Sequence, residues 1–186
     1  MITDEDYSNL MATRAHVASN PNWGTLITEK EFIKGMSLLN PQSYGSRIEK
    51  RIMHDVQGYK IKASENKGDI GLNGKNVEVK VSLLNSVNNS LNMVQVRLFH
   101  DVDYYLCIAY DMRDISNYKK YVFLLTHNQM AHECKRAHAA HGTKSVNELN
   151  ENVELRLQVN CNEGDSVFER WQDAYGINLN EINQFV

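Results

Sequence analysis

The sequence predicts one mixed α/β domain, in which helices flank a central β-sheet. Three stretches indicate this class. Residues 1–40 carry apolar side chains at helical spacing, residues 59–125 contain the alternating or continuously apolar runs typical of strands, and residues 167–175 return to helical spacing. With 186 residues, 42% of them hydrophobic and 23% charged, the chain is long enough to bury one core. We therefore expect a single domain over residues 1–186.

Residues 1–40 are expected to form a helical N-terminal layer. Within it, Thr28 and Glu31 have the spacing of a capping box, in which each side chain accepts a backbone N–H of the other residue. Ser46 and Glu49 repeat this spacing and predict that the next helix begins at Ser46. That helix carries apolar residues at every fourth position, which predicts one buried face: Ile48, Ile52 and Val56.

The functional prediction depends on a β-hairpin over residues 68–80, with Asn73 and Gly74 at its tip. Asn-Gly suits a two-residue type I′ turn because both central residues need positive φ. Pairing outward from this turn places Asp69 opposite Glu78, with the two Cβ atoms about 5 Å apart. On the other face of the second strand we expect a buried row: Val77, Val79 and Val81.

Carboxylates at facing positions repel each other, so Asp69 and Glu78 indicate a metal cation held between them. Lys80 follows Glu78 by two residues and points to the same face, about 7 Å along the strand. Mg²⁺ prefers oxygen ligands, with Mn²⁺ able to substitute, and the Val79 carbonyl is the expected third ligand. Such a cation activates water and neutralises charge during phosphodiester hydrolysis. The alternative is an exposed hairpin face with ordinary ion pairs, each worth under about 1 kcal/mol.

Three further residues are assigned to the site, with an alternative open for each. Glu49 adds a carboxylate to the metal shell, or only completes the capping box of its helix. Gln95 and Arg97 alternate with apolar residues in a strand predicted over residues 93–99. They contact the site or DNA, or form only the polar face of that strand. The apolar face of that strand is expected to consist of Val94, Val96 and Leu98.

Later stretches complete the predicted sheet and add two helices. Continuous apolar runs at residues 104–109 and 121–125 are typical of strands covered on both faces. Thr126 is the expected cap of a helix over residues 127–141, and residues 153–157 alternate as a late strand. The C-terminal helix is marked by four residues: Val167, Phe168, Trp171 and Tyr175.

Cysteines and histidines offer a weaker alternative, a zinc site. Cys134, His138 and His141 fall at i, i+4 and i+7 of the helix predicted over residues 127–141. One helix rarely supplies three converging zinc ligands, so we favour a polar helix surface. The three cysteines are far apart, which predicts reduced thiols and a cytoplasmic protein. No apolar run approaches the roughly 20 residues that span a bilayer, so no membrane association is expected.

The order of the acidic residues and the lysine resembles that of the PD-(D/E)XK nuclease superfamily of restriction endonucleases: Glu49, then Gly68-Asp69, then Glu78-Val79-Lys80. In that superfamily an acidic residue on one strand and an E-x-K on the next form the metal-binding catalytic core, and a glutamate from an earlier helix often assists. Gln95 matches a glutamine that often approaches the site from the following strand. Gly68 stands where the nominal motif has proline, a common departure.

The resemblance covers residues 43–126 and implies a restriction-endonuclease-like mixed sheet flanked by helices. Residues 127–186 would then supply C-terminal helices and a strand. The segment over residues 45–111 looks most like the catalytic region of type IIS restriction endonucleases. The implied activity is Mg²⁺-dependent hydrolysis of double-stranded DNA.

Charge bears on how such an enzyme would find its target. The net charge is −3, which is unusual for a protein that must bind DNA without a partner, although residues 47–80 are locally basic. With no obvious base-reading part, the chain resembles the small catalytic subunit of a heterodimeric enzyme, whose larger subunit recognises DNA and nicks one strand. Three alternatives stay open: a self-sufficient homodimeric restriction endonuclease, a repair or junction-resolving nuclease, and a non-catalytic DNA-binding subunit.

Overall fold

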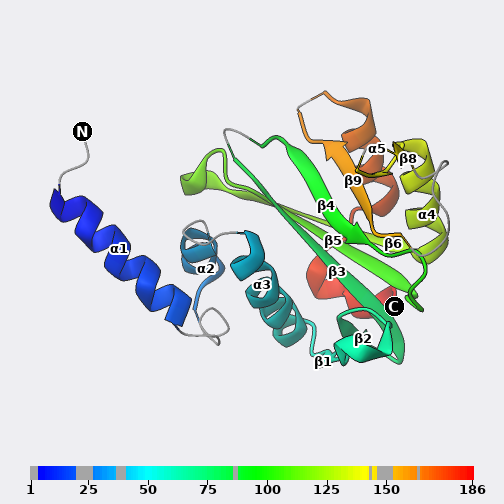
Figure 1. Cartoon of the computed structure of the whole chain (residues 1–186), viewed down its shortest axis with the longest axis horizontal. Helices are drawn as coiled ribbons and strands as arrows, with labels where there is room; N and C mark the ends of the chain where they lie inside the picture. Colours follow the sequence, from blue (N-terminus) through cyan, green and yellow to red (C-terminus); the bar gives the residue numbers. More distant parts are fainter. Residues whose placement is uncertain are drawn as a thin grey trace. The chain divides into compact units, whose positions relative to one another are not determined.

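The computed structural model describes residues 4–19, 27–36, 41–85, 88–142, 144–145, 153–162 and 164–186. It has the predicted mixed α/β class, with helices beside a mixed five-stranded sheet (Figure 1). The chain divides into two compact units, Met1–Asp55 and Val56–Val186. Each unit is described by itself.

The described part of the first unit is helical, as predicted for residues 1–40. Its helices are α1 (Asp4–Ser19), α2 (Glu29–Met36) and α3 (Pro41–Asp55). The capping box before α2 is confirmed, because the Thr28 N–H donates to the Glu31 carboxylate at 3.1 Å and the Glu31 N–H donates to the Thr28 hydroxyl at 3.3 Å. The apolar residues of α2 are buried: Phe32, Ile33 and Met36.

The predicted start of the next helix is wrong. Helix α3 begins at Pro41, five residues before Ser46, so Ser46 and Glu49 lie inside the helix and do not cap it. Proline suits the first turn of a helix because the N–H that it lacks would have no partner within the helix. The buried face was predicted correctly, since Ile48, Ile52 and Val56 are all at most 3% exposed, although Val56 follows the last residue of α3.

The main sheet of the second unit has the strand order β1-β2-β3-β5-β6. Only β3 and β5 pair in parallel, and the other neighbours are antiparallel. β1 is short, because a 3₁₀ turn at Ala63–Glu65 follows it closely. The strands are β1 (Tyr59–Lys60), β2 (Ile70–Leu72), β3 (Lys75–Leu84), β5 (Tyr104–Asp111) and β6 (Lys119–Thr126).

A second sheet of order β4-β9-β7-β8 packs against one face of the main sheet. Parallel strands need a long crossover, and here β4 lies within the connection from β3 to β5. In Figure 1, β4 and β9 run side by side across the main sheet. The strands are β4 (Ser90–Val96), β9 (Leu155–Asn160), β7 (Ala140–His141) and β8 (Lys144–Ser145).

The strand predicted over residues 93–99 differs from β4 in both extent and phase. β4 begins at Ser90, and its register shifts between Met93 and Val96. Val96 is buried as predicted, but Val94 is 52% exposed. The late strand was expected over residues 153–157 and is found two residues later.

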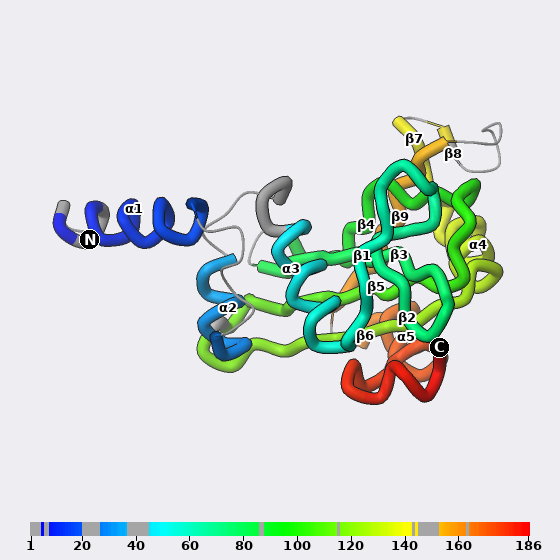
Figure 2. Tube along the Cα trace, turned by 90° about the horizontal axis from the view of Figure 1, so that it is seen from below, coloured from blue at the N-terminus to red at the C-terminus, as the bar shows by residue number. Residues whose placement is uncertain are grey.

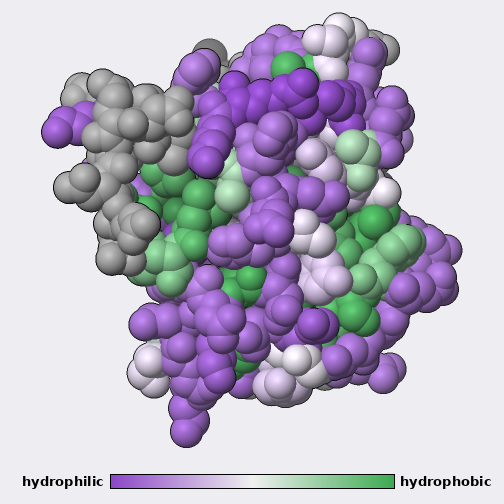
Figure 3. Space-filling model, turned by 90° about the vertical axis from the view of Figure 1, so that its right-hand side faces the viewer, coloured by the Kyte–Doolittle hydropathy of each residue, from purple (hydrophilic) through white to green (hydrophobic). Residues whose placement is uncertain are grey.

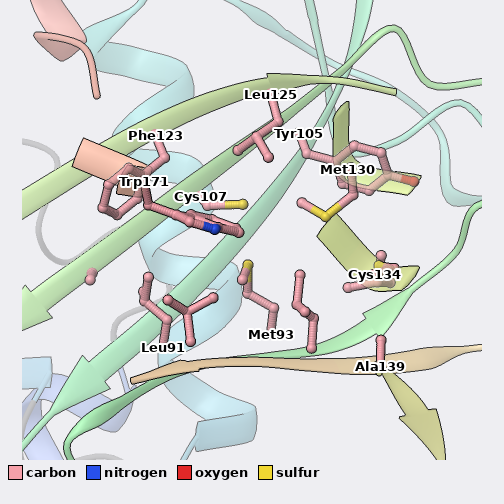
Figure 4. Packing of buried hydrophobic residues seen from close by; sticks show 14 of the residues in the cluster. Leu91, Met93, Tyr105, Cys107, Phe123, Leu125, Met130, Cys134, Ala139 and Trp171 are labelled. Atoms are coloured by element: carbon pink, nitrogen blue, oxygen red, sulfur yellow. The ribbon is translucent and has the colours of Figure 1, made fainter. Parts of the chain in front are cut away.

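The main core of this unit lies between the two sheets and the helices α4 (His127–Arg136) and α5 (Ser166–Tyr175). Trp171 is fully buried and packs edge to face on Phe123, with ring centroids 5.5 Å apart. Figure 4 shows Trp171 and Cys107 next to each other, with Leu91 and Met93 of β4 opposite them. A large aromatic at this place supplies much of the buried apolar area that holds α5 to the sheets.

Helix α4 starts as predicted and ends early. The Thr126 hydroxyl accepts the Gln129 N–H, and the Gln129 side chain accepts the Thr126 N–H in return, which completes a capping box. The helix ends at Arg136 instead of residue 141, and His141 lies in β7. The histidine spacing on which the zinc alternative rested is therefore not helical. Within the described residues, no group of three or more Cys, His, Asp or Glu side chains has the arrangement of a metal site.

The C-terminal segment covers the β6 edge of the main sheet. The Ile177 N–H donates to the Val122 carbonyl at 3.0 Å, and a 3₁₀ segment at Leu179–Gln184 follows. Figures 1 and 2 both show the C-terminus beside the β2–β3 hairpin. There the Asn73 side-chain amide donates to the Val186 main-chain oxygen at 3.2 Å, so the tip of the hairpin contacts the C-terminal segment.

The face seen in Figure 3 is mostly hydrophilic, with apolar side chains in separate patches. Scattered apolar groups are ordinary on a protein surface. In the described part of the chain, no helix has the length and hydrophobicity needed to cross a membrane.

Candidate active site

The hairpin that carries the predicted site has the expected turn and register. Asn73 and Gly74 have φ of 49° and 80°, which is the type I′ geometry that the dipeptide predicts. The pairs Leu72–Lys75, Gly71–Asn76 and Ile70–Val77 are those counted outward from the turn. On the underside Val77 and Val79 are buried, while Val81 is half-buried.

The ladder ends one residue short of the predicted Asp69–Glu78 pair. The Asp69 N–H donates to the Val77 carbonyl at 3.0 Å, so Asp69 leaves the regular pairing. Gly68 is the cause: its φ is +89°, and a Cβ there would lie 2.8 Å from the Val77 carbonyl oxygen. Neither condition admits proline, whose φ is locked near −65°. At Gly68 the chain bends close to β3. This bend fixes the position of the Asp69 backbone, from which its side chain extends to Val79.

The Asp69 carboxylate binds to β3 through a backbone amide. Its Oδ2 accepts the Val79 N–H at 2.8 Å, which takes the place of the strand partner that β2 no longer offers. In a β-strand the N–H and C=O of one residue point to the same neighbour. The Val79 carbonyl is therefore directed to the same edge as Asp69. The carboxylate sits beside the peptide bond that joins Glu78 to Val79.

Glu78 and Lys80 form a buried ion pair. Lys80 Nζ lies 2.6 Å from Glu78 Oε1, and the two side chains are only 11% and 6% exposed. In the parallel pairing Glu78 lies beside Tyr105 and Lys80 beside Cys107, so the pair occupies the sheet face that carries the core. Burial, and then the charge of Glu78, raise the pKa of the Tyr105 hydroxyl. Charges in this setting are tolerated only when paired.

A β-bulge in β4 supplies the second partner of Lys80. The Gln95 carbonyl accepts a hydrogen bond from Lys80 Nζ at 2.8 Å. Gln95 lies at the register shift of β4, with φ of 54°, a left-handed conformation that few non-glycine residues adopt. Bulges redirect groups of the strand that contains them. Here the bulge turns a main-chain carbonyl toward the ammonium group.

Arg97 follows the bulge and pairs with Glu154, which lies directly before β9. Arg97 Nε and Nη2 lie 2.8 and 2.7 Å from Glu154 Oε1, and the two side chains are 31% and 41% exposed. The hydrogen bond from Arg97 is the main reason that the pKa of Glu154 is lowered, and Gln95 and Lys80 lower it further. The Tyr105 hydroxyl donates to the Arg97 carbonyl at 3.0 Å, which anchors the backbone beneath this pair.

His100 is a neutral group among these charges. Burial lowers its pKa from the usual value of 6.5, against the opposite effect of the Glu78 charge. Arg97 and Lys80 lower it further. Its Nδ1 is buried and has no hydrogen-bond partner among the described residues. His100 therefore adds no charge near neutral pH.

Most predicted site residues meet along β3 and β4. Asp69, Glu78, Val79 and Lys80 lie together at the middle of β3, with Gln95 bound to Lys80. Glu49 lies on α3 of the first unit, and its part in the site stays a prediction. Sequence reasoning missed two neighbours, Glu154 and His100. Neither belongs to a motif, and Glu154 lies 57 positions from Arg97.

The site offers oxygen ligands of the type that Mg²⁺ prefers. Asp69 and Glu78 supply carboxylates, and the carbonyl of Val79, which lies between Glu78 and Lys80 in the chain, supplies a third oxygen. This donor set fits a hard divalent cation and does not fit zinc in a thiolate or imidazole site, because no cysteine or histidine belongs to it. The free cysteines are buried, and burial raises the pKa of the Cys134 thiol to about 12.

Neither a protein-family model nor a curated protein matches this chain. The geometry of the site and its chemistry are therefore the basis for assigning a function.

Proposed function

We propose that this chain is a metal-dependent endonuclease that hydrolyses phosphodiester bonds of double-stranded DNA. One observation carries the proposal: three groups suited to this chemistry meet at the middle of β3. Asp69 is hydrogen-bonded to the Val79 N–H, while Glu78 and Lys80, on either side of Val79 in the strand, form a buried ion pair. A buried, preorganised charge pair beside a second carboxylate is the kind of arrangement that recurs at active sites.

Mg²⁺ is the proposed cofactor, with Mn²⁺ as a substitute, held by Asp69, Glu78 and the Val79 carbonyl. When bound, the ion would lower the pKa of a bound water and neutralise charge on the phosphate. The protein residues do the rest. Lys80 supplies positive charge toward the scissile phosphate, and the Glu78 and Gln95 contacts hold its ammonium in place. Glu49 is retained as a proposed further carboxylate.

The finer fold and enzyme class are also proposals. A mixed sheet in which an acidic residue precedes one strand and an E-x-K lies on the next agrees with the PD-(D/E)XK resemblance. We propose a restriction-endonuclease-like fold and a type IIS-like catalytic subunit that cuts one strand. A larger, DNA-recognising partner would supply target selection. The net charge of −3 supports the need for a partner, because phosphate contacts by basic side chains provide most non-specific DNA affinity.

Asp69→Asn tests the site with little change in shape. The amide oxygen can still accept the Val79 N–H, but the charge for a metal is gone. We expect cleavage of duplex DNA in Mg²⁺, with the partner present, to fall by about 100-fold or more. Glu78→Gln and Lys80→Met should have effects of similar size on cleavage. Each leaves a buried charge without its partner, so melting curves should show a lowered midpoint but a protein that is still folded at the assay temperature.

Asp103→Asn is the matched control. Asp103 Oδ2 also accepts a backbone N–H of β3, that of Asn76 at 2.9 Å, but it lies outside the proposed site. This variant should cleave as the unchanged protein does. Undiminished cleavage by Asp69→Asn would refute the site, and vigorous cleavage in EDTA would refute the metal mechanism. Ca²⁺ should support DNA binding without cutting.

A further inference from the structure

Two ion pairs lie next to each other at the site, and they differ in exposure. The Glu78–Lys80 pair is largely buried, with side chains 6% and 11% exposed. The Arg97–Glu154 pair is open to solvent, with side chains 31% and 41% exposed. An exposed ion pair contributes little to stability, so its partners can exchange at low cost.

The Glu154 carboxylate occupies a position whose neighbouring groups are suited to bind an oxyanion. One of its carboxylate oxygens receives both Arg97 Nε and Nη2, at 2.8 and 2.7 Å. Gln95 and the positive charge of Lys80 also lie close enough to lower the pKa of this carboxylate. A guanidinium, an amide and an ammonium together are the donors that bind phosphate oxygens.

Only the Glu154 side chain has to move to vacate this place. The adjoining Leu155 pairs with Val96 in the β4–β9 ladder, and the Glu154 carbonyl lies 2.8 Å from His141 Nδ1. The backbone is therefore anchored while the side chain is half exposed. With Glu154 turned away, Arg97 would be left without its carboxylate, and the site would gain one net positive charge.

We infer that the Arg97 guanidinium, with Gln95 and Lys80 beside it, binds a phosphodiester group of the DNA backbone, and that Glu154 holds this place until the phosphate displaces it. The inference rests on the proposed function and deepens it, because it names the group that receives the substrate. Glu154 acts as an internal competitor: it keeps Arg97 oriented and weakens binding of anions that cannot displace it.

Glu154→Gln removes the competing charge and keeps the size of the side chain. A labelled 20-base-pair DNA duplex is titrated into the full chain in Ca²⁺ buffer, and Kd is read from fluorescence anisotropy. We expect Glu154→Gln to bind about fivefold to tenfold more tightly than the unchanged protein. Arg97→Gln should bind more weakly and lower the slope of log Kd against log salt by about 1. In the Arg97→Gln background, Glu154→Gln should add nothing.

Glu169→Gln is the charge-matched control, since Glu169 is exposed on α5, away from β3 and β4. It should change Kd less than twofold. Equal effects of Glu154→Gln and Glu169→Gln would overturn the inference, as would a gain that persists without Arg97.

A second measurement needs no variant. Inorganic phosphate is added to the unchanged protein, and the Arg97 Nε–H signal is followed by NMR. A saturable shift, reproduced by the duplex at lower concentration, supports a site for backbone phosphate. A shift with inorganic phosphate alone would restrict the site to free phosphate and overturn the DNA assignment, and no shift with either would overturn the site. Tighter binding by Glu154→Gln, with no cleavage in Mg²⁺ even when the partner is present, would refute the nuclease proposal and leave this inference standing.

Discussion

Gly68 shows how one residue determines the backbone position from which the Asp69 side chain extends. Two separate features exclude a larger residue there: φ of +89° and a Cβ position 2.8 Å from the Val77 carbonyl oxygen. Gly74 has a similar φ of +80° but open space around its Cβ position. Alanine substitutions at the two glycines therefore distinguish the effect of backbone strain from that of a close contact.

Gly68→Ala should lower the free energy of unfolding by about 2–3 kcal/mol, because it adds a backbone clash to the left-handed strain. Gly74→Ala should cost about 1 kcal/mol, since only the strain applies. Urea unfolding followed by circular dichroism measures both. Equal losses for the two variants would mean that the close approach to Val77 does not hold in solution.

The bulge residue Gln95 makes a second prediction at this scale. Its φ of 54° is tolerated by asparagine and disfavoured by β-branched residues. We expect Gln95→Val to lose about 1–2 kcal/mol more unfolding free energy than Gln95→Asn. Urea unfolding again provides the measurement. Similar stability of the two variants would show that the bulge relaxes without strain.

At the scale of elements, Glu133 joins two helices. It lies on α4, is 1% exposed, and receives four hydrogen bonds from α5. Arg170 donates two of them, at 2.7 and 2.8 Å, while Trp171 Nε1 and the Tyr175 hydroxyl donate at 3.0 and 2.9 Å. A fully satisfied buried carboxylate orients the helices that surround it.

Glu133→Gln should lower the free energy of unfolding by about 2–4 kcal/mol, because Arg170 loses its charged partner and one donor loses its acceptor. Chemical denaturation at pH 7 gives this value. Asp173→Asn, an exposed change on α5, is the control and should stay within about 0.5 kcal/mol of the unchanged protein. If Glu133→Gln lowered the free energy of unfolding no more than this control does, Glu133 would not be the residue that links α4 to α5.

The same residue predicts a pH dependence. Burial raises the pKa of Glu133, but the hydrogen bonds from Arg170, Tyr175 and Trp171 outweigh it and bring the pKa below 4.5. The unfolded chain therefore binds the proton first as pH falls. The stabilisation is complete above pH 4.5 and is lost as pH falls through the lowered pKa.

The stability difference between the unchanged protein and Glu133→Gln should thus shrink on acidification. Urea unfolding between pH 7 and pH 3 measures it. A difference that stays constant over this range would contradict the lowered pKa.

At the scale of the whole molecule, the net charge of −3 predicts weak DNA binding by the chain alone. We expect the purified chain in Mg²⁺ and about 150 mM salt to leave plasmid DNA without discrete fragments, and lower salt to strengthen non-specific binding. Gel electrophoresis of plasmid digests measures this. Reproducible fragments from the lone chain would favour the self-sufficient homodimer.

Local interactions were predictable from the sequence. Two capping boxes and one turn join residues within three positions of each other, at Thr28, Thr126 and Asn73-Gly74. Neighbouring residues in the sequence therefore determine them. The register of β2 and β3 followed from that turn. The spacing of Glu78 and Lys80 predicted that they share one face of β3, where they form an ion pair.

Contacts between distant segments were decided only by the tertiary structure. The early start of α3, the end of α4 at Arg136 and the bulge at Gln95 depend on packing and pairing that no short window of sequence contains. Glu154 reaches Arg97 across 57 positions because β9 pairs with β4. The sequence alone determined the groups available for chemistry, and the pairing of distant strands decided which of them share a charge environment, since electrostatic coupling depends on distance in space and on burial.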